Sequence, residues 1–157
     1  MNYIVDHIEI SVYHRPLIKI IPKSICIHNT GNPKSTDTNE QAWLENRMNE
    51  VYASAHIFVD DNSATECIPL DEMAYHSGTR KGNMETISIE ICESGNYTNT
   101  LINAKELIVK LLKERGWNET NLNRHYDWSH KICPRKFYEN GKWDKWDLFV
   151  NEIKAML

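Results

Sequence analysis

The chain has 157 residues, of which 41% are hydrophobic and 25% are charged, and this composition is typical of one soluble globular domain spanning residues 1–157. No segment is apolar for long enough to cross a bilayer, so we expect no membrane insertion. The formal net charge of -4 and the lack of a basic face with interleaved aromatic residues argue against a nucleic-acid partner, and we expect a monomer.

The N-terminus does not have the pattern of a signal peptide, and the cysteines do not have the spacing of paired metal or redox motifs. The segment Met1–His7 lacks the basic start and the long apolar run of a signal peptide, which predicts synthesis in the cytoplasm without export. Cys26, Cys67 and Cys92 lie inside apolar runs and no CxxC pair occurs, so we interpret them as buried thiols. Only Cys133 has neighbours that suggest chemistry.

The first quarter of the chain predicts short extended segments. The alternation of Ile8, Ile10 and Val12 predicts a short strand, and the proline-containing segment 15–22 predicts an extended connection without helix. The β-branched run Ser24–Asn29 predicts a central strand.

A helix is expected after the polar loop that follows this strand. Thr38 with Gln41 three residues later forms a possible capping box, and the pattern predicts a helix that continues to about Val51. Its apolar side would consist of Trp43, Leu44, Met48 and Val51.

A hairpin is predicted next. The runs His56–Val59 and Thr65–Pro69 read as two strands, and the polar residues 60–63 read as the turn between them. The segment Asp71–Lys81 is then expected to be a polar loop.

The segment Thr86–Cys92 alternates strictly between residue types. This pattern predicts a strand with Ile87, Ile89 and Ile91 on one face and Glu90 on the other. A carboxylate in the middle of a central strand needs a partner or a function, whereas the alternative is a glutamate that faces solvent or pairs with a lysine.

Two helices are predicted in the remaining part of the chain. One runs from about Thr100 to Glu114 and stops before Gly116, and the last begins at about Lys145 with Asp144 as its N-cap. Strands and helices are mixed without a strict βαβ order, which favours an α/β domain with one mixed central sheet flanked by helices.

The segment 124–134 contains two histidines, a lysine and a cysteine. Imidazole and thiolate are good zinc ligands, and the interval between His125 and Cys133 leaves room for a loop that brings both to one ion. A further ligand must come from elsewhere, and His28 at the end of a predicted strand is the best candidate. Three protein ligands would leave the fourth position for water, which is the arrangement of a catalytic zinc.

Glu90 and Lys131 would complete a hydrolytic site. Near a zinc-bound water, Glu90 would act as the general base. Lys131 beside the metal would stabilise an oxyanion, and the alternative is a solvated loop lysine.

The other histidines are assigned less directly. His130 is close enough in sequence to compete with His125 or Cys133 for the ion, and we interpret it as a residue of the cleft wall. His56 and His76 are expected to line the cleft or to form hydrogen bonds, with His76 the better candidate for contact with substrate.

Five segments carry a family resemblance, and they occur in the order Ile25–Asn32, Ala53–Asp60, Tyr75–Gly78, Ile87–Cys92 and His125–Pro134. Together they resemble the zinc-dependent N-acetylmuramoyl-L-alanine amidases of phage endolysins and bacterial autolysins, a family related to the peptidoglycan-recognition proteins. The match covers most of the chain. The resemblance implies a mixed central sheet with helices around it and a zinc in a surface groove.

The resemblance also implies a role for each candidate residue. His28, His125 and Cys133 take the places of the zinc ligands, with one Zn²⁺ per chain. Glu90 takes the place of the catalytic acid/base, and Lys131 that of the basic residue beside the metal.

The implied reaction is hydrolysis of the amide bond between N-acetylmuramic acid and the L-alanine of the stem peptide. Bacterial peptidoglycan would be the substrate, and the protein would act on the cell wall after release or lysis. The alternative is a non-catalytic peptidoglycan-binding module on the same fold. Cys133 argues against it, because recognition proteins without amidase activity typically lack the cysteine ligand.

Overall fold

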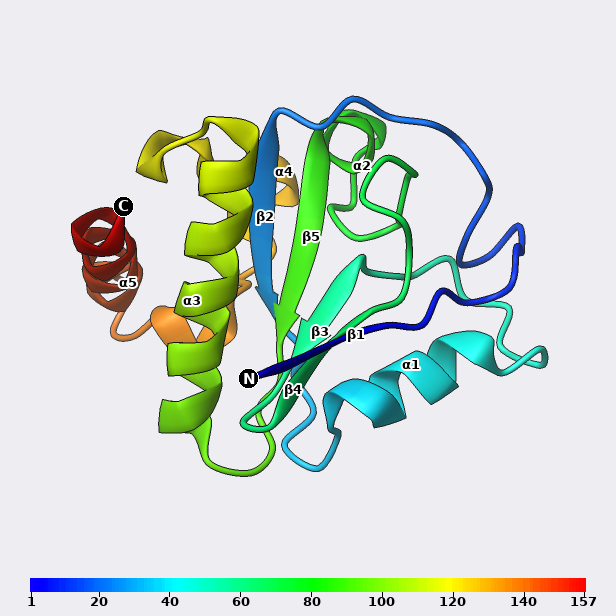
Figure 1. Cartoon of the computed structure of the whole chain (residues 1–157), viewed down its shortest axis with the longest axis horizontal. Helices are drawn as coiled ribbons and strands as arrows, with labels where there is room; N and C mark the ends of the chain where they lie inside the picture. Colours follow the sequence, from blue (N-terminus) through cyan, green and yellow to red (C-terminus); the bar gives the residue numbers. More distant parts are fainter.

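A computed structural model describes residues 1–157 and has one six-stranded sheet at its centre (Figure 1). The strands lie in the order β1-β4-β3-β5-β2-β6. Their bounds are Asn2–Val5 for β1, Ser24–Asn29 for β2, Ile57–Val59 for β3, Ser63–Glu66 for β4, Thr86–Ile91 for β5 and Leu122–Arg124 for β6. The sheet is mixed, because β4 runs antiparallel to β3 while β3, β5, β2 and β6 are mutually parallel. The predicted α/β fold with a mixed central sheet is confirmed.

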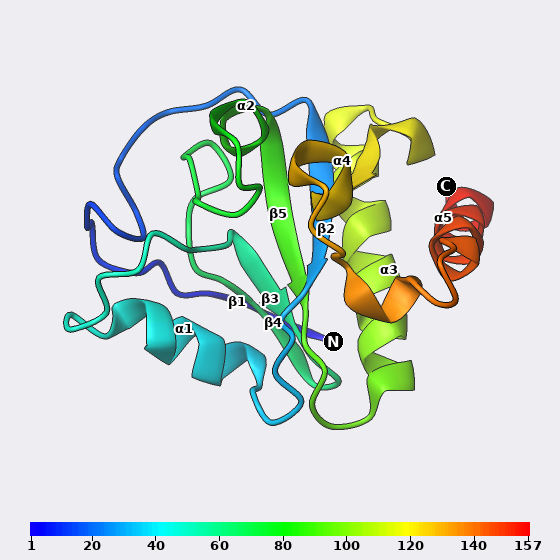
Figure 2. The ribbon, with the colours of Figure 1, turned by 180° about the vertical axis from the view of Figure 1, so that it is seen from behind.

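Helices cover both faces of the sheet. Their bounds are Asp37–Glu45 for α1, Arg80–Glu85 for α2, Tyr97–Arg115 for α3, His125–Ser129 for α4 and Asp144–Met156 for α5, with short 3₁₀ turns at Glu119–Asn121 and Arg135–Phe137. The long helix α3 lies in front of the sheet in Figure 1 with α5 beside it, and α4 lies in front of β2 in the reverse view of Figure 2. No helix is both long enough and apolar enough to pass through a membrane.

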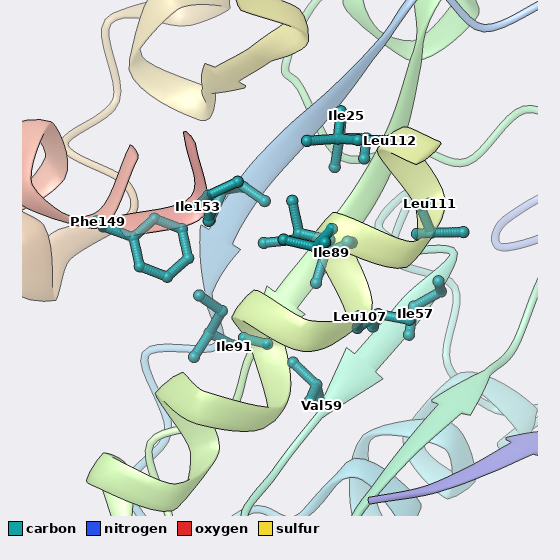
Figure 3. Close-up of a cluster of buried hydrophobic side chains, with 14 of the residues drawn as sticks. Ile25, Ile57, Val59, Ile89, Ile91, Leu107, Leu111, Leu112, Phe149 and Ile153 are labelled. Atoms are coloured by element: carbon teal, nitrogen blue, oxygen red, sulfur yellow. The ribbon is translucent and has the colours of Figure 1, made fainter. Parts of the chain in front are cut away.

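The main core lies between α3, α5 and one face of the sheet (Figure 3). Ile89 and Ile91 of β5 pack there with Leu107 and Leu112 of α3, and all four side chains are buried. Glu90 lies on the opposite face, as the alternation predicts. A fully buried Leu or Ile side chain is worth about 1.5–3 kcal/mol, so this face carries much of the stability and leaves the other face for the site.

The predicted hairpin is confirmed, but its second strand lies at Ser63–Glu66 instead of Thr65–Pro69 and so begins within the predicted turn. β3 and β4 pair antiparallel with Ile57 opposite Glu66, and Asp60 accepts hydrogen bonds from the backbone amides of Asn62 and Ser63 in the turn. The Asp60 side chain satisfies the amides that the turn leaves unpaired.

The predicted strand at the N-terminus is wrong in position. The strand is β1 at Asn2–Val5, which pairs parallel with β4 at the sheet edge, while Ile10 and Val12 are 61% and 58% exposed. Alternation of three apolar residues did not identify the strand, because an edge strand needs only a pairing partner and not a buried face.

The first helix is shorter than predicted and has a different cap. Thr36 is the N-cap and forms a capping box with Asn39, whereas Thr38 lies within the first turn. The helix ends at Glu45, because Asn46 adopts an extended conformation and Asn49 donates to the Trp43 carbonyl. Asparagine side chains that bond to nearby backbone groups compete with helix propagation. The predicted apolar side is therefore wrong except for Leu44, which is buried, whereas Trp43, Met48 and Val51 are exposed.

The later helices match the prediction more closely. α3 begins three residues earlier than expected, with Asn96 as its N-cap, and ends before Gly116 as predicted. Gly116 adopts a left-handed conformation with φ 65°, which favours glycine at this position. α5 begins at Asp144, so this residue is the first of the helix and Trp143 is the N-cap. The sequence did not predict α2, β6 or α4, all of which are short.

Candidate metal centre

His28 and Glu90 lie side by side on the neighbouring strands β2 and β5. In the parallel pairing of β2 with β5, His28 is the register partner of Glu90. The Nδ1 atom of His28 is 3.8 Å from a carboxylate oxygen of Glu90. The sheet register therefore holds a carboxylate beside a buried imidazole.

His125 reaches the same place through β6. The last residue of this strand, Arg124, is the register partner of Ile27, so His125 comes next to His28, and the two ring centroids are 4.7 Å apart. The Asp127 carboxylate accepts a hydrogen bond from the Arg124 backbone amide at 2.8 Å, which starts α4 directly at the histidine. The strand thus fixes the position of the ring and the short helix fixes its direction.

A tight turn after α4 brings Cys133 back toward the sheet. His130 ends the helix in a left-handed conformation, and the Tyr126 backbone amide donates to the Cys133 carbonyl at 3.1 Å. The backbone amide of Lys136 donates to the side chain of Asn29 at 3.0 Å, which ties the following segment to the end of β2. The cysteine is therefore held from both sides.

One donor atom from each of His28, His125 and Cys133 lies within 4.8 Å of the other two, and all three residues are buried. The Cys133 Sγ atom is 3.7 Å from the His28 Nδ1 atom. Nitrogen and sulfur ligands on a tetrahedral zinc would be separated by about 3.6 Å at the usual bond lengths. These three residues could hold a metal ion with little movement.

Two buried polar atoms at this cluster have no hydrogen-bond partner, the Nδ1 atom of His125 and the Oε2 atom of Glu90. Such atoms are rare in protein interiors, because each costs about 1–3 kcal/mol when unpaired. These unpaired atoms fit a metal ligand in the case of His125 and a proton acceptor in the case of Glu90.

Burial keeps both imidazoles neutral. It lowers the pKa of His28 well below the ordinary value, and the neighbouring His76 adds to this shift. It also lowers the pKa of His125 to about 4, with the positive charge of Lys131 contributing. Only a neutral imidazole has a lone pair for a metal, so this environment favours ligation.

Burial acts on the acidic groups in the opposite direction. It raises the pKa of Glu90 to about 8, where the negative charge of Glu40 adds to the shift and Lys131 opposes it. It raises the pKa of the Cys133 thiol to about 12, with the negative charge of Glu90 contributing. A thiol must lose its proton to bind a metal, so a cation would have to displace this proton.

A cavity of about 460 Å³ opens beside the cluster. Residues of α1, including Glu40, line one part of it, and residues of α4 and of the turn that follows it line another. Among the predicted site residues, its walls include His76, Glu90, His125, Lys131 and Cys133. The cavity gives a ligand access to His125, Cys133 and the Glu90 carboxylate at once.

The remaining histidines differ in their surroundings. His76 is buried with its ring 3.1 Å from His28, and these two residues with Cys26 form a second group of possible donors. His130 is exposed, meets the Tyr126 ring edge-to-face and lies outside both groups. It does not line the cavity, so the prediction of a cleft-wall residue is wrong. His56 is buried with both ring nitrogens hydrogen-bonded.

Sequence reasoning missed the residues that hold the loop around His76. The Asn83 side chain in α2 accepts hydrogen bonds from the backbone amides of His76 and Ser77, at 3.1 and 2.9 Å. The only local signal for α2 is Thr79, whose hydroxyl accepts from the Gly82 amide at the start of the helix. A six-residue helix is too short to show an apolar period.

Fold and site together define an α/β domain with a cluster of possible metal ligands and an unpaired carboxylate oxygen beside one cavity, an arrangement that metal-dependent hydrolases also have. The match to a known family is more specific. Residues 19–136 match the family N-acetylmuramoyl-L-alanine amidase, and the chain belongs to this family.

Two curated relatives illustrate the similarity. The N-acetylmuramoyl-L-alanine amidase CwlH of Bacillus subtilis (strain 168) is 37% identical over 159 residues, which cover 96% of this chain and 60% of the relative. The amidase XlyA of the same organism is 35% identical over 155 residues, which cover 95% of this chain and 50% of the relative. The chain spans about half the length of the curated relatives that it matches.

Solved structures have the same fold. The catalytic domain of XlyA is 33% identical, with a TM-score of 0.89 and coverage of 98% of this chain and 99% of that one. PlyL is 29% identical, with a TM-score of 0.85 and coverage of 98% of both chains. The expected similarity to endolysin amidase domains is therefore confirmed at the level of the fold.

Proposed function

We propose that this domain is a zinc-dependent peptidoglycan hydrolase that cleaves the amide bond between N-acetylmuramic acid and the L-alanine of the stem peptide. The observation that carries the proposal is a cluster of three possible metal ligands, two of which line one cavity together with Glu90, whose Oε2 atom is unpaired. Membership of the N-acetylmuramoyl-L-alanine amidase family supports the choice of bond.

His28, His125 and Cys133 would hold one zinc ion per chain. Two imidazoles and a thiolate suit zinc better than calcium or magnesium, which prefer oxygen ligands. When bound, zinc supplies a Lewis acid that polarises a carbonyl oxygen and lowers the pKa of a coordinated water to about 7.

Glu90 is proposed to move the protons of the reaction. Its carboxylate accepts a proton from the attacking water and then donates it to the departing amine, so the carbon–nitrogen bond breaks without a charged leaving group. A pKa raised to about 8 by burial suits a group that must both accept and donate a proton near neutral pH.

Lys131 and His76 are proposed to act on the substrate. Both line the cavity. The Lys131 ammonium would stabilise the negative charge that develops on the carbonyl oxygen, and the His76 ring would contact the bound peptidoglycan. We place this activity at the bacterial cell wall, which the protein would reach after release or lysis, as an endolysin or autolysin does.

The decisive experiment combines metal analysis with release of stem peptides from purified cell walls. We expect about one zinc per chain, loss of release after chelation and recovery on addition of zinc. Cys133→Ser should weaken metal binding, whereas His130→Ala should retain it, because His130 is exposed and lies outside the donor group. Full release from a metal-free protein would refute the proposal, and binding to walls without release would instead indicate a peptidoglycan-binding module.

A further inference from the structure

A line of buried hydrogen bonds connects α2 to His28. The Thr86 hydroxyl, at the start of β5, donates to the Gly82 carbonyl at 2.8 Å. The same hydroxyl oxygen is 3.1 Å from Nε2 of His76, and Nδ1 of His76 is 3.1 Å from Nε2 of His28. Thr86, His76 and His28 are all buried, so water does not compete for these contacts.

The direction of each hydrogen bond follows from the number of protons. A hydroxyl has one proton, and Thr86 uses it for the Gly82 carbonyl, so its oxygen can only accept from His76. A neutral His76 then has no proton on Nδ1, and this atom must accept from Nε2 of His28.

This direction of the hydrogen bonds determines the protonation of Nδ1, the other nitrogen of His28. A neutral ring that carries its proton on Nε2 has a free lone pair on Nδ1, and Nδ1 is the atom that lies 3.7 Å from Cys133 Sγ. In the opposite tautomer of His28, a proton would occupy Nδ1, and the lone pairs of His28 Nε2 and His76 Nδ1 would face each other unless His76 also changed its tautomer. The tautomers of His28 and His76 are therefore coupled.

We propose that His76, oriented by Thr86, is a positioning residue that holds His28 in the tautomer whose Nδ1 can bind the metal. The inference rests on the zinc centre proposed above and adds a function to a residue otherwise expected to contact substrate. Partners of metal-binding histidines typically change metal affinity by 10–100-fold when they are removed.

The test uses two variants of the same shape at His76. Asparagine keeps an acceptor oxygen close to the position of Nδ1, and leucine has a methyl group there, so His76→Asn and His76→Leu differ mainly in the acceptor. A second pair changes the remote hydroxyl, because Thr86→Val removes it and Thr86→Ser keeps it. Zinc affinity is measured by competition with a chelator, ring tautomers by long-range ¹⁵N NMR of the metal-free proteins, and folding by thermal midpoints.

We expect the His28 ring of the wild-type protein to carry its proton on Nε2 before any metal is added. His76→Leu should lose about 10–100-fold in zinc affinity, whereas His76→Asn should stay close to wild type. Thr86→Val should shift the His76 ring toward its other tautomer and reduce zinc affinity, and Thr86→Ser should restore both.

Two outcomes would overturn the proposal. One is a His28 ring protonated on Nδ1 in the wild-type protein, and the other is an equal loss of affinity in His76→Asn and His76→Leu, which would indicate a purely structural role. A wild-type protein that binds no zinc would refute the metal centre itself, while the tautomers of the metal-free protein would still decide whether the hydrogen bonds run in the proposed direction.

Discussion

Glu90 owes its properties to its position on a central strand. A glutamate in water has a pKa of about 4.3, whereas burial raises the pKa of Glu90 to about 8. One of its oxygens is buried without a partner and the other lies 3.8 Å from His28. The carboxyl group is therefore held next to the metal donors without a salt bridge that would fix its charge.

Replacement of this carboxyl group by an amide tests its role. Glu90→Gln keeps the shape of the side chain but cannot accept a proton, so turnover should fall by about 10²–10⁴ while zinc content and thermal midpoint stay near wild type. Glu114→Gln, on the exposed side of α3, serves as the control and should change none of these quantities. Unchanged turnover in Glu90→Gln would remove this residue from the mechanism.

Two short helices, α2 and α4, hold the loops of the site against each other. Gly82 of α2 lies so close to Ser77 and Trp128 that a Cβ atom added there would come within 2.6 Å of the Ser77 Cβ and 2.8 Å of the Trp128 ring. The Trp128 ring in α4 donates to the Asn123 side chain at 2.7 Å, which ties α4 to β6. Close contact at one glycine therefore links the loop of His76 to the helix of His125.

Gly82→Ala should separate these two helices. Overpacking of a tight contact typically destabilises by about 1–3 kcal/mol, and we expect a loss of this size in the free energy of unfolding, measured by chemical denaturation. Zinc affinity should fall as well, because Ser77 and His125 are displaced together. Lys81→Ala, in the same helix but exposed, is the matched control, and an equally stable Gly82→Ala protein would contradict the close packing.

At the scale of the whole molecule, a long connection joins β1 to β2 and passes along one side of the domain and close to α2 (Figure 1). Arg15 anchors this segment by donating to the Glu72 carboxylate at 2.8 Å and to the Ile8 carbonyl at 2.8 Å. The Glu72 side chain is only 4% exposed. Its pKa lies below the ordinary value, first because of the hydrogen bond from Arg15 and then because of the charges of Arg15 and Lys19.

This pair should give the protein a pH-dependent term in its stability. Because the folded state lowers the pKa of Glu72, the stabilisation is fully present above the ordinary glutamate pKa of about 4.3 and is lost as the pH falls through the folded-state pKa. Glu72→Gln should therefore lower the free energy of unfolding by about 1–3 kcal/mol at neutral pH, and the difference from wild type should shrink in acid.

Asp71→Asn provides the control for this measurement. Asp71 pairs with Lys19, but both side chains are more than 60% exposed, and such pairs contribute little. Chemical denaturation of the three proteins at a series of pH values distinguishes the two sites. A constant difference between Glu72→Gln and wild type at every pH would contradict the ionic origin of the effect.

Local patterns in the sequence predicted the elements with a strong period and the candidate side chains of the site. The alternation in Thr86–Ile91 predicts both the strand and the face of Glu90, because burial on one face repeats along the chain at a fixed interval. The histidines and the cysteine were predicted as metal ligands because few side chains can bind zinc.

Only the tertiary structure decided how these residues meet. His28 and Cys133 are 105 residues apart in sequence, and their contact depends on the register of β2 with β6 and on the turn after α4. The short helices that support the site have no measurable period, and pKa values depend on burial by the whole fold. A sequence specifies which groups are present along the chain, but distances and burial arise from long-range packing, so the hydrogen bonds from Thr86 through His76 to His28 became visible only in the folded protein.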